Sequence, residues 1–408
     1  MTHPACRLCG DKMTQMFADL GAMPHARCLA STGAGEDQCH PLRVLVCRRC
    51  LLVQSGGYLD EDIRSLSRHA TASPGAEARV AASLIGRFSL TATSRVMEAG
   101  STDGDLLLAF QEAGIPVLGI EPDQALAARA QARGVPTEAA LLNAETAMEI
   151  AAAHGRGDLV IARGVLAEVP DLFGFAAGFA GILRPNGIAA FEFPHLLDLM
   201  EQTRFDRIDH AQCSYLSLLV VERILRSVGL SVFDLERLPA PGGLRVFACH
   251  ARGPYLQRPS VRAMRAKEVA AGLDHAAGYN AFAPRMEAAT HAIRDFVATR
   301  RRLGRRITAH GVTPETNSLL NACGLTLDDI VCIADPAPDK QGMRLPGSRV
   351  PVVSPLELAA ARPDDVLIFG ASDPLDIVAD LAARLPVGTA FWGLLPTPHA
   401  MTPHLEAA

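Results

Sequence analysis

The chain has 408 residues, of which 49% are hydrophobic, and a formal net charge of −5. This length accommodates two or three domains with cores of their own, while no apolar run approaches the roughly 18 to 20 residues that a membrane span requires. The mild negative charge argues against a nucleic-acid-binding protein, because such proteins usually carry a basic face.

The start of the chain predicts a cytoplasmic, metal-binding domain. The first residues lack a basic start followed by an apolar stretch, so we expect no signal peptide and ten reduced cysteines. Four of these form two Cys-x-x-Cys pairs: Cys6, Cys9, Cys47 and Cys50. Four thiolates suit a tetrahedral zinc ion and leave no open position for a substrate, so we expect a structural site.

The segment between the two pairs leaves an alternative open. It contains four more possible ligands: His25, Cys28, Cys39 and His40. One pair could therefore recruit a different partner. Gly10, directly after the first pair, helps the chain turn back toward the sulfurs.

Residues 95–122 predict a cofactor turn. Residues 95–110 read as a buried strand, a glycine-bearing turn and a helix, and a second strand ends at an acid, Glu121, placed to accept ribose hydroxyls. The turn spacing is Gly-x-x-x-Gly, and Glu98 and Asp103 would repel a pyrophosphate but suit a sulfonium and an ammonium group. We therefore expect S-adenosylmethionine (SAM) rather than a nicotinamide dinucleotide.

The predicted sheet continues after this turn. Residues 158–163 and 187–193 read as core strands, the second after a turn at 185–187, and they end near Arg163 and Glu192. Ligands of such sheets lie beyond the carboxyl ends of the strands. The cofactor-binding candidates are Glu98, Gly100, Ser101, Asp103, Gly104, Glu121, Pro122 and Arg163.

The remaining pattern predicts an α/β protein of three parts. A hairpin pairs residues 230–234 with 244–248, a helical connector follows at about 257–304, and strands at 306–310, 330–335 and 366–370 indicate a second Rossmann-like sheet. The expected boundaries are 1–75 for a zinc-binding domain, 76–252 for the SAM-binding domain, and 253–408 for the connector and C-terminal domain.

Several segments in this order carry a family resemblance. They are the two cysteine pairs and residues 97–104, 191–194, 205–217, 241–245, 316–321 and 339–347. With them the chain resembles the zinc-containing C-methyltransferases that act on nucleotide-linked deoxysugars. The resemblance covers essentially the whole chain and implies a zinc domain, a central methyltransferase domain and a C-terminal Rossmann-like domain, with the sugar nucleotide held between the last two.

The chain departs from this family where the base is expected. The family segment Tyr-His-Glu-His-Phe-Ser-Tyr, in which the second histidine serves as base, corresponds to residues 209–215, and Gln212 stands at the base position. An amide cannot accept the proton. The candidate catalytic residues are therefore His210, Asp209 and Tyr215, and a purely structural His210 is an equal alternative.

The nucleotide-sugar side differs as well. Glu315 replaces a lysine and Thr316 a glycine in the phosphate-facing turn, and Pro241 replaces a histidine. An anionic side chain facing a pyrophosphate weakens binding. We therefore predict a methyltransferase of specialised metabolism, antibiotic biosynthesis among its settings, that acts on a different small-molecule acceptor as a monomer or homodimer. The alternatives are another SAM-consuming reaction, or a SAM-binding partner protein without catalysis.

Overall fold

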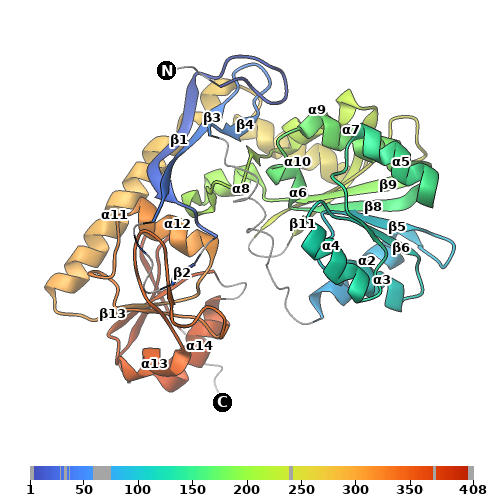
Figure 1. The fold of residues 1–408 in the computed structure, drawn as a ribbon. Coiled ribbons are helices and arrows are strands. Elements are labelled where there is room, and N and C mark those ends of the chain that lie inside the picture. Colours follow the sequence, from blue (N-terminus) through green and yellow to red (C-terminus); the bar gives the residue numbers. More distant parts are fainter. Residues whose placement is uncertain are drawn as a thin grey trace.

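The computed structural model describes residues 4–27, 29–31, 35, 37–57, 75–238, 242–370 and 374–402. Figure 1 shows an N-terminal unit above two α/β domains, of which the central domain lies to the right and the C-terminal domain to the lower left. One connected cluster of buried apolar side chains includes residues of all three parts. Within the described residues, no helix is long and apolar enough to cross a membrane.

The N-terminal unit is an antiparallel sheet that reaches into both other domains. Its strands are β1 (Gln15–Pro24), β3 (Cys39–Val46) and β4 (Val53–Ser55), and the fourth strand, β10 (Ser214–Tyr215), comes from the central domain. The two-residue strand β2 (Ala30–Ser31) pairs with β15 (Met343–Arg344) of the C-terminal domain. Backbone hydrogen bonds therefore cross the boundaries expected near residues 75 and 252.

The central domain is a doubly wound sheet of order β11-β12-β9-β8-β5-β6-β7. Strands β5 to β9 are parallel, and β12 and β11 continue the sheet as the antiparallel hairpin predicted from sequence. Its strands are β5 (Val96–Ala99), β6 (Val117–Ile120), β7 (Thr137–Glu138), β8 (Gly157–Arg163), β9 (Leu183–Phe193), β11 (Leu230–Leu238) and β12 (Gly243–His250). The strand order reverses between β5 and β8, and such switch points open a crevice at the carboxyl ends of the strands.

Helices cover both faces of this sheet (Figure 1). The helices of this domain are α2 (Ala76–Phe88), α3 (Asp105–Glu112), α4 (Gln124–Ala132), α5 (Ala144–His154), α6 (Val165–Glu168), α7 (Leu172–Ile182), α8 (Leu196–Glu201), η1 (Phe205–Arg207) and α9 (Leu218–Ser227), of which η1 contacts α12 (Pro314–Ala322) of the C-terminal domain. The turn expected at residues 185–187 lies inside β9, where the register with β8 is irregular, so the strand begins earlier than predicted.

A helical connector leads to the C-terminal domain. It consists of α10 (Pro259–Ala270), η2 (Ala276–Tyr279) and α11 (Phe282–Arg302), and α11 packs along β1 (Figure 1). At that contact the rings of Phe17 and Phe282 stack with centroids 4.4 Å apart. Both rings are fully buried, so the connector shares its core with the N-terminal unit.

The C-terminal domain has a sheet of order β16-β14-β13-β17-β18-β19, parallel except for β19. Its remaining elements are β13 (Ile307–His310), α12 (Pro314–Ala322), β14 (Ile333–Ala334), β16 (Val352–Val353), α13 (Pro355–Ala360), β17 (Asp365–Ile368), α14 (Pro374–Arg384), β18 (Ala390–Gly393) and β19 (His399–Met401). The strand expected at 330–335 is shorter than predicted, because only Ile333–Ala334 joins the ladder.

Candidate functional site

The structure gathers the four paired cysteines into one cluster. Their sulfur atoms all lie within 4.8 Å of one another, with Cys6 and Cys50 3.4 Å apart and Cys9 and Cys47 3.5 Å apart. Sulfurs at 2.3 Å from a tetrahedral zinc ion would be about 3.8 Å apart, so the cage fits the metal after a small expansion. Cys39 is exposed and lies outside this cluster, and Cys28 lies outside the described residues.

The two knuckles share one backbone design. The amide of Gly10 donates to the Cys6 carbonyl at 2.9 Å, and the amide of Leu51 donates to the Cys47 carbonyl at 2.8 Å. Both residues have positive φ, 74° for Gly10 and 65° for Leu51. A leucine in this conformation costs roughly 1–2 kcal/mol, which burial of its side chain in the core offsets.

The thiols of the cluster differ in pKa. The hydrogen bond with Cys50 lowers the pKa of the Cys6 thiol to about 5, while the same contact and burial raise the pKa of Cys50. The Cys50 amide also points at the Cys47 sulfur at 3.5 Å. Amides directed at sulfur stabilise thiolates, the form in which cysteine binds zinc.

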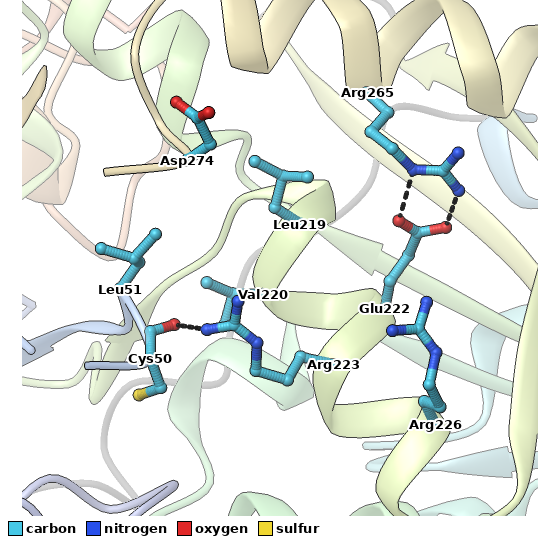
Figure 2. A pocket seen from close by; sticks show the side chains of 9 residues that line it. All are labelled: Cys50, Leu51, Leu219, Val220, Glu222, Arg223, Arg226, Arg265 and Asp274. Atoms are coloured by element: carbon cyan, nitrogen blue, oxygen red, sulfur yellow. Dashed lines mark hydrogen bonds and ion pairs between the residues drawn. The ribbon is translucent and has the colours of Figure 1, made fainter. Parts of the chain in front are cut away.

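Arginines connect this cluster to the central domain. The Arg7 guanidinium donates to the carbonyls of Ser55, at 2.9 Å, and Cys213. Figure 2 shows Arg223 of α9 donating to the Cys50 carbonyl in a pocket of about 210 Å³. The two knuckles therefore hold both ends of the segment that contains β10 and the start of α9.

The cofactor turn lies at the carboxyl end of β5, as the sequence predicts. Gly100 and Gly104 have φ of 72° and 86°. A Cβ atom on Gly100 would lie 2.4 Å from a methyl of Val165, and one on Gly104 would lie 3.0 Å from a methyl of Val135. Both glycines are therefore needed for packing against neighbouring elements, besides the ligand approach expected from the motif.

Glu98 and Arg163 meet at the switch point. The Arg163 Nε donates to Glu98 Oε1 at 3.0 Å, and its Nη1 contacts Glu77 of α2 at 2.7 Å. Burial raises the pKa of Glu98 to about 7, against the opposing effect of Arg163. Glu98 Oε2 has no hydrogen-bond partner among the described residues, nor has the buried Ser101 Oγ. Both unsatisfied oxygens belong to the turn where the sequence predicts the ammonium group of SAM.

Glu121 is fully buried beside the turn. Its two carboxylate oxygens accept the amides of Thr102 and Asp123, each at 2.9 Å. Thr102 has a φ of 50°, a strained value for a β-branched residue, and the bond to Glu121 helps to hold it. Pro122 lies between Glu121 and Asp123. Because Glu121 binds amides on both sides of the turn, it stabilises the turn, and the sequence also predicts that it binds the ribose hydroxyls.

Asp103 and Glu192 have protein partners. Asp103 lies 3.2 Å from Arg133 with a side chain 38% exposed. Glu192, at the end of β9, pairs with Arg245 of β12 at 2.6 Å. Each of these carboxylates is therefore neutralised by an arginine of the protein.

The candidate base segment, residues 209–215, is buried between the N-terminal unit and the central domain. Asp209 Oδ1 accepts the amides of Ala211 and Gln212 at 2.9 and 3.0 Å, and its Oδ2 accepts from Arg27 at 3.2 Å. The Tyr215 hydroxyl contacts the Asp209 carbonyl at 3.5 Å, and burial raises the Tyr215 pKa well above its usual value. Both side chains therefore have structural partners within the protein.

His210 is different. Its Nε2 lies 3.1 Å from the His40 carbonyl, which can only accept, so Nε2 carries the hydrogen and Nδ1 carries the lone pair. Nδ1 is buried and has no partner among the described residues. Burial lowers the His210 pKa, so the ring is a neutral acceptor near pH 7. The ring of His25 stacks against it with centroids 6.2 Å apart.

Arg27 and Glu168 belong to the same cluster and were not predicted. The Arg27 Nη1 contacts Glu168 Oε1 of α6 at 3.0 Å while its Nε contacts Asp209. Glu168 is the last residue of α6, and Val165, the first residue of this helix, packs against Gly100 of the cofactor turn. The base segment is thereby tied to the carboxyl end of the cofactor sheet. No local pattern marks this contact, because its three residues come from distant segments.

A cleft of about 800 Å³ separates the central and C-terminal domains. On the side of the central domain the cleft is lined by Arg204 and Asp206, which come just before the base segment in the chain. On the side of the C-terminal domain it is lined by Glu315 and Phe369. Arg204 holds Asp206 in a fork with distances of 2.7 to 3.1 Å, and Arg237, also in the lining, pairs with Asp198 at 2.7 Å. Both lining guanidinium groups thus already face carboxylates.

Family models match successive parts of the chain. They are a zinc binding domain at residues 6–63, a methyltransferase domain at 75–235 and a C-methyltransferase C-terminal domain at 240–396. The chain is also 33% identical over 405 residues to C-methyltransferase NovU of Streptomyces niveus, covering 97% of this chain and 96% of that one. The chain belongs to the SAM-dependent C-methyltransferases. Its cofactors are SAM and zinc, and the α/β fold and family predicted from sequence are confirmed.

Solved structures give weaker matches to this C-methyltransferase. A 1,6-didemethyltoxoflavin N1-methyltransferase of Burkholderia thailandensis is 22% identical, with a TM-score of 0.33 and coverage of 43% of this chain and 79% of that one. A magnesium protoporphyrin IX methyltransferase of Synechocystis is 14% identical, with a TM-score of 0.33 and coverage of 47% and 91%. Similarity at this level supports no statement about the substrate.

Proposed function

We propose that this C-methyltransferase methylates a carbon atom of a small-molecule acceptor of specialised metabolism, bound in the cleft between the central and C-terminal domains, with His210 as the base. The observation that carries the proposal is the His210 ring. It is buried and neutral, its Nδ1 has no partner among the described residues, and its segment is tied to the cofactor sheet. Because the ring does not line the cleft, the bound acceptor must displace the side chains that cover Nδ1. The match to NovU supports the reaction class.

The residues define the steps. Bound SAM would supply the methyl group for an in-line displacement, with S-adenosylhomocysteine as the product released. Before transfer, His210 Nδ1 would accept the proton from the acceptor carbon, so that the electron pair of the broken C–H bond forms the bond to methyl. Glu98 and Arg163 would hold the charged end of the donor, and the buried cluster excludes water, so most of the rate comes from alignment.

The proposed acceptor is not a nucleotide-linked sugar. Three observations support this: the lining arginines are already paired, Glu315 lines the cleft, and the Thr313 hydroxyl caps α12 by accepting the Thr316 amide at 3.2 Å. A diphosphate would have to displace carboxylates and face another one. A neutral ketone or phenol-like acceptor meets no such repulsion.

Three measurements test this function. Calorimetry should show SAM and S-adenosylhomocysteine binding, and no heat for thymidine or uridine diphosphate at millimolar concentration. The protein should be incubated with SAM and a panel of ketones, phenols and amines, with a nucleotide-linked keto-sugar for comparison. We expect release of S-adenosylhomocysteine with an acceptor that is methylated on carbon. His210→Gln should then lose at least about a hundredfold in kcat, the usual value of a general base, with SAM binding unchanged.

Other results would favour the alternatives. Release of methylthioadenosine from SAM alone would indicate a different SAM-consuming reaction. SAM binding without turnover across the panel would favour a non-catalytic partner protein. Tight diphosphate binding would return the acceptor to the nucleotide-sugar class.

A further inference from the structure

Arg27 has an unusual position between three segments. It follows β1 in the N-terminal unit, and its guanidinium spans Glu168 of α6 at 3.0 Å and Asp209 at 3.2 Å, with only 19% of its side chain exposed. Burial alone would lower the Arg27 pKa, but Asp209 and Glu168 outweigh burial and raise it overall, so the group stays charged. A buried bridge of this kind is costly to form and costly to break.

The bridge ends on the residue that shapes the His210 turn. One oxygen of Asp209 is held by Arg27, and the other accepts the amides of Ala211 and Gln212, directly after His210. On its other side the His210 ring contacts the His40 carbonyl. The His210 ring is thus held directly by the His40 carbonyl, and Arg27 supports, through Asp209, the backbone turn that carries the ring.

We propose that Arg27 is a positioning residue for His210: by fixing Asp209 against Glu168, it holds the 209–212 turn and the imidazole in register with α6, the helix that follows β8. The role of His210 as base rests on the proposed function. The orientation of its ring does not, and it can be measured without an acceptor.

The charges around His210 predict how the ring responds. It is faced by His25, directly after β1, by His40 from β3 and by Asp209 from its own segment. Without Arg27, the Asp209 carboxylate loses its counter-charge and stabilises a protonated His210 more strongly. The His210 pKa should therefore rise, which moves the acid limb of any base-dependent activity to higher pH.

The test uses the full-length protein labelled with 15N-histidine, with the His210 signals among the 13 histidines assigned by His210→Gln. In wild type, His210 should keep its hydrogen on Nε2. In Arg27→Met, the tautomers should mix and the His210 pKa should rise. Exchange of the Ala211 and Gln212 amides should accelerate at least about tenfold, because a bond to a charged group is weakened. Arg27→Lys, or guanidinium chloride below denaturing concentration, should restore part of the wild-type signal.

Matched variants keep the result decisive. Arg43→Met removes an exposed ion pair with Asp19 in the same unit and should change none of these signals. If Arg27→Met fails to fold, Glu168→Gln should shift the same signals in the same direction by less. Unchanged His210 signals in a folded Arg27→Met or Glu168→Gln protein would overturn the proposal. A wild-type protein that does not bind SAM, or a His210→Gln protein with full turnover, would instead contradict the proposed function.

Discussion

Single buried carboxylates set the chemistry at the cofactor turn. Glu98 lies at the switch point with one oxygen paired to Arg163 and the other unpartnered among the described residues, and burial brings its pKa to about 7. An acid with such a pKa changes charge within the physiological range. Glu121 differs, because two backbone amides already satisfy it. The two acids are therefore expected to contribute in different ways.

The first prediction concerns the pH dependence of SAM binding. If the ionised Glu98 holds the donor's ammonium group, the dissociation constant should increase about tenfold per pH unit below pH 7 and be constant above it, because one proton must be lost on binding. Calorimetry at several pH values in buffers of different ionisation enthalpy measures both the affinity and the proton release. Glu98→Gln should bind more weakly and without this pH dependence. A wild-type affinity that is flat from pH 5 to 8 would contradict the placement.

The second prediction concerns Glu121. Glu121→Gln keeps the size of the side chain but offers a single acceptor oxygen, so either Thr102 or Asp123 loses its bond and the strained turn loosens. We expect SAM affinity to fall at least about tenfold, since each charged hydrogen bond contributes roughly 1.5–3 kcal/mol. Asp103→Asn is the comparison, because Asp103 is partly exposed and paired with Arg133. An equal loss in both variants would mean that Glu121 has no special part.

At the scale of elements, short polar contacts join α8, α9 and α10 to one another. His195, at the start of α8, is fully buried, with Nε2 2.8 Å from Glu268 of α10 and Nδ1 3.4 Å from Asp198. Glu268 also accepts the amides of Leu218 and Leu219 at the start of α9. Burial alone would lower the His195 pKa, but the two carboxylates raise it overall. This network fixes three helices around one charged group.

The third prediction follows from the sign of that shift. A histidine whose folded pKa is raised stabilises the fold fully below its unfolded pKa of about 6.5, and this contribution is lost as pH rises through the folded value. Glu268→Gln should cost about 3–5 kcal/mol at pH 6, because it leaves a buried charge without its partner. Denaturant unfolding of wild type, Glu268→Gln and His195→Gln between pH 5 and 9 measures this. A His195→Gln protein with the wild-type pH slope would exclude the network as its source.

At the scale of the whole molecule, the zinc cluster helps to organise the candidate active site. β10 extends the N-terminal sheet, Arg7 contacts the Cys213 carbonyl, and Arg223 contacts the Cys50 carbonyl. On the opposite side, Asp37 pairs with the buried Arg344 of the C-terminal domain at 2.8 Å. The N-terminal unit is therefore an interdomain connector as well as a metal-binding domain.

The fourth prediction is the effect of metal loss. Cys50→Ser should remove a zinc ligand and destabilise the fold by more than about 4 kcal/mol, as expected for loss of a structural metal. Hydrogen exchange should increase first in the knuckles and at Ser214–Tyr215, and later in β5 to β8. Cys39→Ser, outside the cluster, serves as the control. If hydrogen exchange in Cys50→Ser increased equally across the chain, or did not increase at β10, the coupling between the zinc cluster and the base segment would be contradicted.

Much of the fold could be predicted from local signals in the sequence. The spacing of the cysteine pairs, the glycine turn after β5 and the alternation of strands and helices depend on neighbouring residues, so they can be read along the chain. The same signals gave wrong strand bounds where pairing with a neighbouring strand decides which residues are extended. The 185–187 turn became part of β9, and most of the 330–335 segment stayed outside the ladder, because a strand exists only where a partner forms its hydrogen bonds.

The candidate site divides in the same way. The sequence by itself determined the ligand types, namely four thiolates for zinc and acids beside a turn for a cationic cofactor, because chemistry follows residue identity and spacing. Only the tertiary structure decided their roles: Arg27, Glu168 and Asp209 meet from three distant segments, and the His40 carbonyl selects the His210 tautomer. Long-range contacts and burial set these partners and pKa values, and neither is encoded in any local pattern.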